Sequence, residues 1–271
     1  METKPSLSYV AQDYIRSHSL QCKLLIQAVE DQVFISITNQ QQEVQYLENV
    51  ALQDFLEETF FFENLKFESS LLLCIPETVD LMPFAEQELQ QVFDRLLDAE
   101  DPTSIHQEII PHTGITARFT VAQGEYAIRK KLGEIRLIPS CNMLIKQLKD
   151  LGKPEQKSIA IQVYPQEFEL CYFHGEKFMY YKRFPMAGAD DFNYFFLAVL
   201  EQFELATGEV HIYLSGRISQ GDSLYQRLQK YSSSIAFIPV DIHLPESLSG
   251  YPTHELALLW GLSTCVSLEE D

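Results

Sequence analysis

Basic residues and glycine are scarce in this chain. Of its 271 residues, 20 are lysine or arginine and 11 are glycine, against 39 aspartates and glutamates. The formal charge of −19 repels the phosphates of nucleic acids and of anionic membrane surfaces. We therefore expect neither a nucleic acid nor an anionic membrane surface to be a partner.

Long apolar runs and paired cysteines are also missing. No stretch approaches the ~20 consecutive apolar residues that span a membrane, and the N-terminal stretch has no apolar core of a signal peptide. An odd, scattered set of cysteines is typical of free thiols in a reducing compartment, and neither they nor the histidines have metal-ligand spacing. We expect a cytoplasmic protein with no membrane-inserted segment, no disulfide framework and no metal site. The cysteines are Cys22, Cys74, Cys141, Cys171 and Cys265.

The sequence has enough apolar residues for a folded core, and it repeats one hairpin pattern. Hydrophobic residues make up 46% of the chain, whose length allows one large domain or two of ordinary size. Residues 24–37 read LLIQAVEDQVFISI and residues 159–172 read IAIQVYPQEFELCY. Ile26 aligns with Ile161, an offset of 161 − 26 = 135 residues. Apolar and polar residues alternate in both segments, which predicts two antiparallel hairpins.

The elements after each hairpin are predicted to follow in the same order. At the same offset, the third strand of each half aligns Val44 with Met179 and Tyr46 with Tyr181. The periodicity of the first half predicts strands at 23–29, 33–38, 43–49, 69–76, 117–121 and 135–139, and helices at 51–64, 84–98, 125–132 and 141–151. That of the second half predicts strands at 158–164, 167–173, 177–184, 211–216 and 235–239, and helices at 189–206, 223–231 and 254–262. We interpret the repeated order as an internal duplication, although any two amphipathic hairpins would share the alternation.

A break at Gly152-Lys153-Pro154 separates the two halves. The first half is longer, because residues 26–139 span 113 positions and the equivalent residues 161–239 span 78, a difference of 113 − 78 = 35. The predicted parts are a lead-in at 1–20, a first domain at 21–153 with an insertion near 98–134, and a second domain at 154–271.

The repeated order of strands and helices resembles that of the actin, Hsp70 and sugar-kinase superfamily. Residues 211–228 (HIYLSGRISQGDSLYQRL) resemble its adenosine-contacting segment, and residues 186–192 (MAGADDF) resemble the helix entry of its cell-division and pilus-assembly members. Residues 20–265 as a whole resemble an uncharacterised bacterial family with an actin-like ATPase fold. The resemblance implies an α/β fold with mixed sheets, in which two ribonuclease H-like β-β-β-α-β-α-β-α domains face each other across a nucleotide cleft.

The hairpin turns depart from the pattern of the active members of that superfamily. There, each turn has an aspartate followed by glycine and a small hydroxylic residue, so that backbone N–H groups approach the phosphate and the aspartate helps to hold hydrated Mg²⁺. Neither turn of this chain contains glycine, serine or threonine, and its proline has no N–H to donate. The carboxylates would also repel a polyphosphate unless a metal intervened. The vestigial turns are Glu30-Asp31-Gln32 and Pro165-Gln166-Glu167.

The segment that resembles the adenosine site is altered as well. In Ser215-Gly216-Arg217, an arginine stands where the superfamily has a second glycine. We expect its side chain to intrude on the backbone contact with a nucleotide, and we therefore predict no catalytic residue and no cofactor. The alternative is a divergent ATPase or kinase that binds ATP and Mg²⁺ in the interdomain cleft through Asp31 or Glu167.

Basic residues gather in one part of this acidic chain. Eight of the 20 lie between positions 129 and 157, which predicts either a docking face for an acidic partner or a solvated helix face and linker. The residues of the predicted docking face are Arg129, Lys130, Lys131, Lys146 and Lys149. The leading interpretation is a bacterial pseudo-ATPase scaffold that binds a protein or peptide, as pilus-assembly relatives do, and self-association is compatible with it. The sequence does not predict the partner, the pathway or the oligomeric state.

Overall fold

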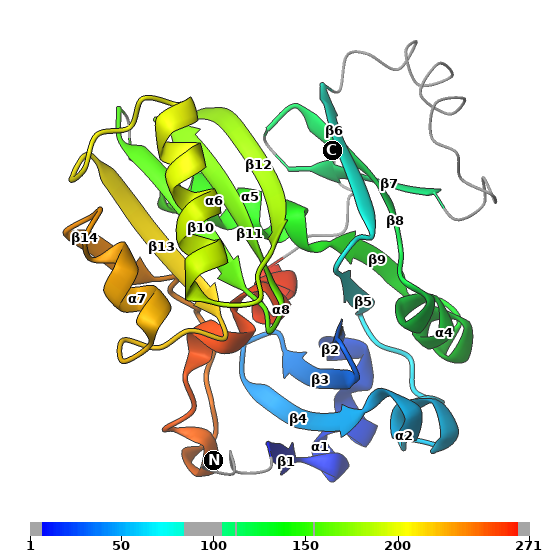
Figure 1. Cartoon of the computed structure of the whole chain (residues 1–271). Helices are drawn as coiled ribbons and strands as arrows, with labels where there is room; N and C mark the ends of the chain where they lie inside the picture. Colours follow the sequence, from blue (N-terminus) through cyan, green and yellow to red (C-terminus); the bar gives the residue numbers. More distant parts are fainter. Residues whose placement is uncertain (1–6, 84–104, 112, 154, 265–271) are drawn as a thin grey trace. The chain divides into compact units, whose positions relative to one another are not determined.

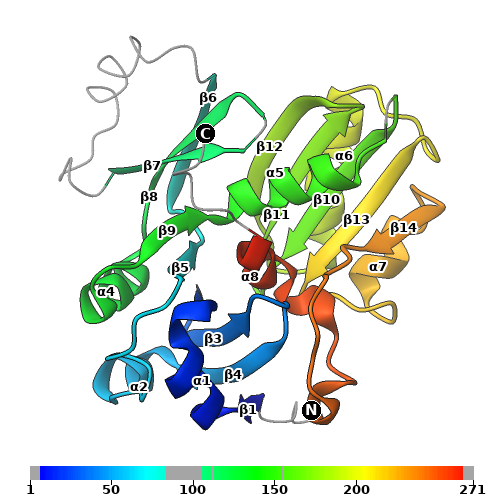
Figure 2. The ribbon, with the colours of Figure 1, turned by 180° about the vertical axis from the view of Figure 1, so that it is seen from behind.

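A computed structural model describes residues 7–83, 105–111, 113–153 and 155–264, which form two compact units (Figures 1 and 2). Unit 1 is built from Met1–Asn142, Asp241–Tyr251 and Leu259–Asp271, and unit 2 from Met143–Val240 and Pro252–Leu258. The first passage between the units, after Asn142, lies upstream of the break predicted at Gly152-Lys153-Pro154. No helix in the described part of the chain is long and apolar enough to cross a membrane.

The main sheet of unit 1 has six strands in the order β1-β4-β3-β2-β5-β9. Strands β2, β3 and β4 form an antiparallel meander, β1 pairs with β4, and β5 and β9 continue the sheet in parallel with β2. Most β2 side chains are buried whichever face they point to, which fits its central place and its apolar sequence CKLLIQAV. The bounds are β1 (Ser8–Val10), β2 (Cys22–Val29), β3 (Gln32–Asn39), β4 (Val44–Ala51), β5 (Ser69–Cys74) and β9 (Arg136–Pro139).

Three helices contribute to the core on one face of this sheet. Each provides a fully buried apolar side chain that packs in one core with the β2–β3 hairpin, namely Ile15, Phe55 and Ile128. These side chains come from α1 (Gln12–His18), which continues into the 3₁₀ turn η1 (Ser19–Gln21), from α2 (Leu52–Glu57) and from α4 (Gln123–Leu132). A further helix, α5 (Ser140–Leu151), follows β9.

The helix predicted at 51–64 is too long. α2 ends at Glu57, and the next residue, Glu58, is extended, with φ −82° and ψ 157°. The rings of Phe55 and Phe60 then stack with their centroids 5.2 Å apart. The aromatic residues after Glu57 therefore lie in a turn and not on a longer helix. Their rings reach the core by stacking on one another.

A separate three-stranded antiparallel sheet, in the order β6-β8-β7, lies between β5 and α4 in the sequence. Its strands are β6 (Thr78–Pro83), β7 (Ile105–Ile110) and β8 (Ile115–Thr120). The described part of unit 2 has no counterpart to it, so the extra elements of unit 1 begin at Thr78, earlier than the position near 98 that the sequence suggests. The helix predicted at 84–98 lies outside the described residues.

The sheet of unit 2 has five strands in the order β12-β11-β10-β13-β14. Strands β10, β11 and β12 form an antiparallel meander, and β13 and β14 continue the sheet in parallel with β10. The long helix α6 lies across one face and α5 across the other (Figures 1 and 2), and Phe192 and Phe196 of α6 share a core with Ile161 and Leu214. The bounds are β10 (Lys157–Val163), β11 (Glu167–His174), β12 (Lys177–Pro185), α6 (Ala189–Gln202), β13 (Val210–Gly216), α7 (Ser223–Leu228) and β14 (Ser234–Phe237).

The hairpins β2–β3 and β10–β11 pair at the register that the offset of 135 predicts. Ile26 lies opposite Ile35 in unit 1, and Ile161 lies opposite Leu170 in unit 2. The strand orders β4-β3-β2-β5-β9 and β12-β11-β10-β13-β14 correspond as well. A common origin of the two units stays a prediction.

The third strands correspond with a different offset. In unit 1, Ile37 of β3 pairs with Tyr46 of β4, and a bulge follows Ile37. In unit 2, Tyr172 is the equivalent of Ile37; it pairs with Tyr180 of β12, and a bulge follows Tyr172 as well. The alignment of Tyr46 with Tyr181 is therefore wrong by one residue, and the offset is 180 − 46 = 134. The reason is a shorter connection in unit 2: five residues separate the paired Thr38 and Val44, whereas four separate the paired Phe173 and Phe178.

The C-terminal part of the chain returns to unit 1. The N–H of Val44 donates to the carbonyl of His243 (3.0 Å), and the N–H of His243 donates to the carbonyl of Gln42 (2.8 Å). Further along, Trp260 is 1% exposed, and its indole nitrogen donates to Ser36 Oγ at 3.2 Å. The helices α1, α2 and α4 cover the face to which the neighbours of Ser36 in β3 point. Neighbouring residues of a strand point to opposite faces, so Ser36 and Trp260 lie on the other face of the sheet.

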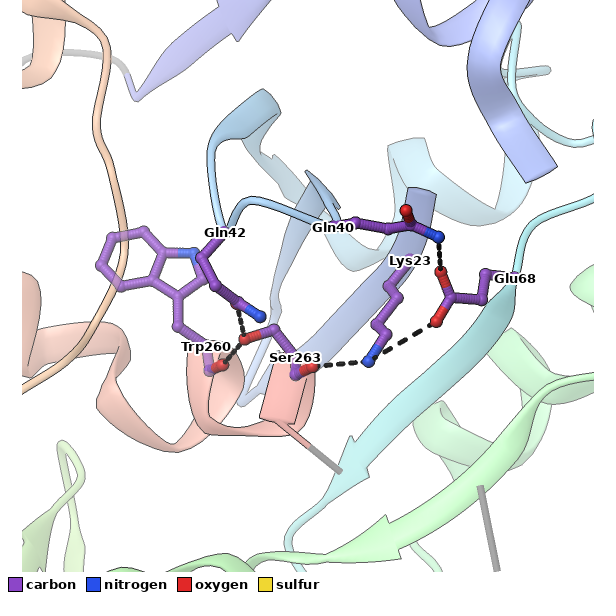
Figure 3. Close-up of polar contacts among 6 residues, drawn as sticks. All are labelled: Lys23, Gln40, Gln42, Glu68, Trp260 and Ser263. Atoms are coloured by element: carbon purple, nitrogen blue, oxygen red, sulfur yellow. Dashed lines mark hydrogen bonds and ion pairs between the residues drawn. The ribbon is translucent and has the colours of Figure 1, made fainter. Parts of the chain in front are cut away.

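Figure 3 shows the polar contacts that hold the end of this segment. Lys23 Nζ donates to the carbonyl of Ser263 (2.6 Å) and lies 3.9 Å from a carboxylate oxygen of Glu68. The Ser263 hydroxyl also contacts Gln42, and Gln40 donates to Glu68 at 3.2 Å. The segment contains the 3₁₀ turns η4 (Glu246–Leu248), η5 (Thr253–Leu256) and η6 (Leu262–Thr264), and the predicted closing helix is reduced to α8 (Ala257–Gly261).

Candidate functional site

The turn between β2 and β3 is a tight two-residue turn. Val29 pairs with Gln32, which leaves Glu30 and Asp31 to reverse the chain. Glu30 has φ +54°, a left-handed conformation that glycine adopts most easily. The turn therefore keeps a backbone conformation suited to glycine, but a glutamate side chain occupies the position.

The turn between β10 and β11 is tied to neighbouring groups. The N–H of Tyr164 donates to the carbonyl of Glu167 at 2.9 Å. Arg183 Nε lies 3.1 Å from Glu167 Oε2, and Pro165 has no N–H. One oxygen of Glu167 is therefore already paired with a cation of its own unit.

Both turns are closed by the same backbone hydrogen bond. In unit 1, the N–H of Leu52 donates to the carbonyl of Asp31 at 2.7 Å. In unit 2, the N–H of Met186 donates to the carbonyl of Gln166, also at 2.7 Å. The acceptors are 135 residues apart and the donors 134, as the register of the strands requires. The two turns are therefore structurally equivalent, and each is anchored by the residue that follows its own third strand.

The end of β13 is packed against β10 without any side chain between them. Gly216 has φ +83°, and a β-carbon there would lie 2.1 Å from the carbonyl oxygen of Val163. Beside it, the buried hydroxyl of Ser215 donates to Gln162 Oε1 at 2.6 Å. Packing within unit 2 is sufficient to require glycine at this position, whether or not a ligand is bound.

The loop after Gly216 uses its amide groups internally. The N–H of Arg217 donates to the carbonyl of Val163, and that of Ile218 to the carbonyl of Gly216, both at 2.9 Å. The N–H of Ser219 donates to Asp222 Oδ2 at 2.6 Å. Three consecutive backbone donors are thus satisfied within the chain, and the loop does not present them to a phosphate.

A buried carboxylate that the sequence analysis missed lies at the carboxyl end of β5. Glu125 is 3% exposed, and its two oxygens accept hydrogen bonds from the N–H of Ile75 (2.6 Å) and of Ala122 (3.1 Å). The second contact has the spacing of a capping box, A-x-x-E, but without the serine or threonine that would mark it in the sequence. Since each oxygen holds a backbone donor, the carboxylate has a structural role.

The described cysteines are buried, and the pKa values of two of them are raised. Cys22, Cys74, Cys141 and Cys171 are buried free thiols, as the scattered pattern predicts. Burial and then the charge of Glu68 raise the pKa of Cys22 to about 11, and burial and then Glu125 raise the pKa of Cys74. A raised pKa keeps the thiol protonated, whereas the thiolate is the reactive form.

No metal-binding cluster is present in the described residues, where histidine, cysteine and carboxylate side chains nowhere gather in groups of three or more. The carboxylates of the two hairpin turns belong to different units. Glu30 and Asp31 belong to the turn of unit 1, and Glu167 belongs to the turn of unit 2. Neither turn by itself offers the six or so oxygen ligands that Mg²⁺ takes, although water can supply several of them.

The predicted docking residues lie on two helices, one in each unit. Arg129, Lys130 and Lys131 are in α4, and Lys146 and Lys149 are in α5. Some of these cations have acidic or aromatic partners inside the chain. Lys131 Nζ lies 3.0 Å from Glu63 and over the rings of Phe55 and Phe60, and Lys146 Nζ lies 2.9 Å from Asp150. The docking face stays a prediction, and these pairs reduce the charge available for it.

A model of the family described as "Protein of unknown function (DUF3822)" matches residues 11–235. The chain belongs to this family. Residues 11–235 include both meanders and both vestigial turns of the DUF3822 chain. No curated protein matches it.

Solved structures that resemble the DUF3822 chain have the actin-like fold. One is a Bacteroides thetaiotaomicron protein described as having an actin-like ATPase fold and unknown function; its TM-score is 0.73 at 15% identity, over 92% of this chain and 98% of that one. Another comes from the "PilM-PilN type IV pilus biogenesis complex", with a TM-score of 0.62 at 11% identity, over 89% of this chain and 97% of that one. The prediction of a two-domain α/β protein with an actin-like ATPase fold is confirmed, and so is the resemblance to an uncharacterised family.

Proposed function

We propose that this DUF3822 protein is an actin-like scaffold that binds a protein partner and does not hydrolyse nucleotide. The observation that carries the proposal is the loop after Gly216, where the N–H groups of Arg217, Ile218 and Ser219 all donate within the chain. Proteins bind phosphates chiefly with free backbone N–H groups and cations in glycine-rich turns. A loop that has already paired these donors would lose internal hydrogen bonds on binding a nucleotide.

The two hairpin turns support the same proposal. Glu30 occupies a glycine-like conformation with a charged side chain, and Pro165 lacks an N–H. Glu167 is paired with Arg183. A polyphosphate needs positive charge and hydrogen-bond donors. Each turn instead places a negative charge near the phosphate position or lacks a backbone N–H there.

A role in binding a protein is supported by a structure of the same fold. The PilM structure was solved in a complex with PilN, named as a type IV pilus biogenesis complex. The actin-like fold can therefore serve to seat another protein. We extend this general role to the DUF3822 protein, but not the identity of the partner.

Thermal denaturation in the presence of ATP and Mg²⁺ tests the proposal. A ligand at about 100 times its Kd stabilises a protein by about 2.7 kcal/mol, which raises the Tm of a chain of this size by at least ~2 °C. We expect no shift between Mg²⁺ alone and Mg²⁺ with millimolar ATP. A reproducible shift of ~2 °C or more would overturn the non-nucleotide role and favour the divergent ATPase or kinase.

The variants Asp31→Asn and Glu167→Gln show whether such a shift comes from the vestigial turns. If ATP binds through a metal at these carboxylates, each variant loses the shift. The matched control is Asp241→Asn, a change of the same kind at an exposed residue of unit 1 outside the turns. A shift that persists in all three variants would indicate nucleotide binding elsewhere in the chain.

A further inference from the structure

Helix α6, which lies across one face of the sheet of unit 2 (Figure 1), carries apolar side chains on its outer face as well. Its inner face packs into the core through Phe192 and Phe196. On the outer face, Tyr194 is 68% exposed, Leu197 is 38% exposed, and Ala198 is exposed beside them. Helices on a protein surface normally carry polar residues on the side opposite the core. The outer face of α6 departs from this rule.

The corresponding helix of unit 1 has a polar outer face. Helix α2 follows the third strand of unit 1 as α6 follows that of unit 2. The core residue of α2 is Phe55, and its exposed residues are Gln53, Asp54 and Glu57. The apolar outer face is therefore a feature of α6 and not of every helix at this point in the fold.

The exposed tyrosine of α6 stands on an aromatic base. The rings of Tyr194 and Phe195 meet edge to face with their centroids 5.2 Å apart, and Phe195 stacks on Phe184 of β12 at 4.9 Å. Phe184 itself is buried in the core of unit 2. Tyr194 therefore has little side-chain freedom to lose when a partner covers it, and tyrosine is one of the residues that dominate the binding energy of interfaces.

The C-terminal end of α6 is negatively charged. Glu201 and Glu204 are exposed there, and neither has an ion pair in the described chain. No lysine or arginine occurs in the sequence between Arg183 and Arg217. The end of the helix adds a partial negative charge of its own, which favours a cation nearby.

Two cations from neighbouring elements already have partners within unit 2. Arg227 of α7 pairs with Asp190 at 2.5 Å, and Lys182 of β12 lies over the ring of Phe184, 5.7 Å from its centroid. The glutamates at the end of α6 thus stay available to a cation from outside the chain. An apolar stripe with a negative end is complementary to a partner that is apolar and basic.

We propose that the outer face of α6 binds an amphipathic helix of a partner protein that carries lysine or arginine residues. The apolar side of the partner helix would cover Tyr194, Leu197 and Ala198, and its cations would lie beside Glu201 and Glu204. Side chains three and four positions apart share one face of a helix, so a second helix can pack along the stripe. The inference rests on the proposed function, because it names a docking surface for that scaffold.

The same charges disfavour a second copy of the chain as the occupant. A two-fold interface uses the same patch on both subunits. Two α6 helices packed antiparallel would therefore bring Asp191 of one copy toward Glu201 of the other. Both residues are exposed and acidic, and like charges across an interface are unfavourable. A basic partner avoids this repulsion, which is why we commit to that chemistry.

Selection from a library of helical peptides tests the inference. Each displayed peptide carries leucine, isoleucine or phenylalanine at every third or fourth position, and lysine or glutamate at random in between. We expect selection on the native protein to enrich lysine over glutamate. The recovered peptides should also become helical when they bind, which circular dichroism of the mixture shows by comparison with the separate components.

Matched variants locate the binding surface. Tyr194→Ser/Leu197→Gln removes the apolar stripe, and its control is Tyr126→Ser/Leu20→Gln, which makes the same changes at exposed residues of unit 1. We expect peptide affinity to fall at least ~10-fold in the α6 variant and less than ~2-fold in the control. Urea denaturation checks that both variants are folded.

Charge reversal tests the end of the helix independently of the apolar stripe. Glu201→Lys/Glu204→Lys should weaken peptide binding at least ~5-fold. The control, Glu134→Lys/Glu176→Lys, makes the same change at exposed glutamates outside α6 and should alter binding less than ~2-fold.

Several results would overturn the inference. These are enrichment of glutamate or of neither charge, bound peptides that gain no helix, equal losses in an α6 variant and its control, and a selection that recovers no peptide. A native dimer that Tyr194→Ser/Leu197→Gln dissociates, as measured by sedimentation, would identify a second copy as the occupant instead. Titration with ATP and Mg²⁺ keeps these failures distinct from failure of the proposed function. A nucleotide-dependent rise in Tm would refute the scaffold role, whereas loss of peptide binding alone would refute only the α6 site.

Discussion

A β-carbon on Gly216 would lie 2.1 Å from the carbonyl oxygen of Val163, far inside van der Waals contact. The obstacle is backbone, which cannot rotate away as a side chain can. At the same place the N–H of Arg217 donates to that carbonyl. Glycine at the end of β13 thus allows two strands to approach, and its presence alone is weak evidence for a nucleotide site.

We expect Gly216→Ala to lower the free energy of unfolding by about 3 kcal/mol, from the overlap and the left-handed φ together. Gly208→Ala is the matched control, because Gly208 has φ +88° but nothing within 4 Å of the added β-carbon. The control should lose only about 1 kcal/mol. Urea denaturation followed by circular dichroism measures both. Equal losses in the two variants would show that the contact with Val163 is unimportant.

Glycine in place of Glu30 should raise the free energy of unfolding. Glu30 has φ +54°, which costs a residue with a side chain about 1–2 kcal/mol. Glu30→Gly relieves this strain but adds about 0.4–1 kcal/mol of conformational entropy to the unfolded chain. We expect a net gain of about 0.5–1 kcal/mol in urea denaturation. Asp31→Gly, at a position without positive φ, should instead lose about 0.5–1 kcal/mol.

Stability should depend on pH through His106. Burial and then the charge of Arg129 lower the pKa of His106 below its usual value. The unfolded chain therefore binds this proton more readily. The contribution to stability is present above ~6.5, the unfolded pKa, and is lost as the pH falls below that value through the lowered pKa of the folded protein. Unfolding free energies measured between pH 7.5 and 5.5 should fall less steeply in His106→Asn.

His174→Asn is the control for this measurement, because His174 is exposed at the end of β11. If His106→Asn retains the native slope, His106 has the same pKa in the folded and the unfolded chain, and the assignment of its lowered pKa is wrong.

The return of the C-terminal segment should contribute strongly to the stability of unit 1. Trp260 is buried against the sheet, with its indole N–H on Ser36. We expect Trp260→Ala to cost about 3–5 kcal/mol, and Ser36→Ala to cost about 1 kcal/mol because the indole N–H loses its acceptor. Trp260 is the single tryptophan of the chain, so the variant has no tryptophan fluorescence. The unfolding should therefore be followed by circular dichroism. A loss under 1 kcal/mol for Trp260→Ala would mean that the segment is only loosely held.

The elements that the sequence predicted well are those with a strong local signal. The alternation of apolar and polar residues placed the ends of β2, β3, β10 and β11 within one or two residues. The alternation reports directly on these strands, because their side chains pack against neighbours on both faces of the sheet. β6 and β7 were missed. Their small sheet is partly exposed on both faces, so a charged residue such as Asp80 can lie in a strand. The apolar alternation that predicts a half-buried strand is therefore weak in this part of the sequence.

The candidate site was predicted less completely than the fold. The two vestigial turns were placed correctly as turns, because their charged and proline residues interrupt the alternation. Glu125 was not found, since its contact with Ile75 joins residues 50 positions apart and leaves no periodic signal. The internal pairing of the loop after Gly216 depends on hydrogen bonds to Val163 and Asp222, which only the folded structure shows.

The path of the chain sets the order in which the protein can be completed during synthesis. Trp260 and Ser263 close the open face of the first sheet, yet the ribosome makes them after all of unit 2. Domains generally fold in the order in which they emerge, and translation adds about 5–20 residues per second. Between the emergence of β4 and that of Trp260, the face of the sheet around Ser36 has no tryptophan to cover it. The N-terminal half begins to fold first and is finished last, so at that rate chaperones have about 10–40 s in which to bind an exposed β-sheet.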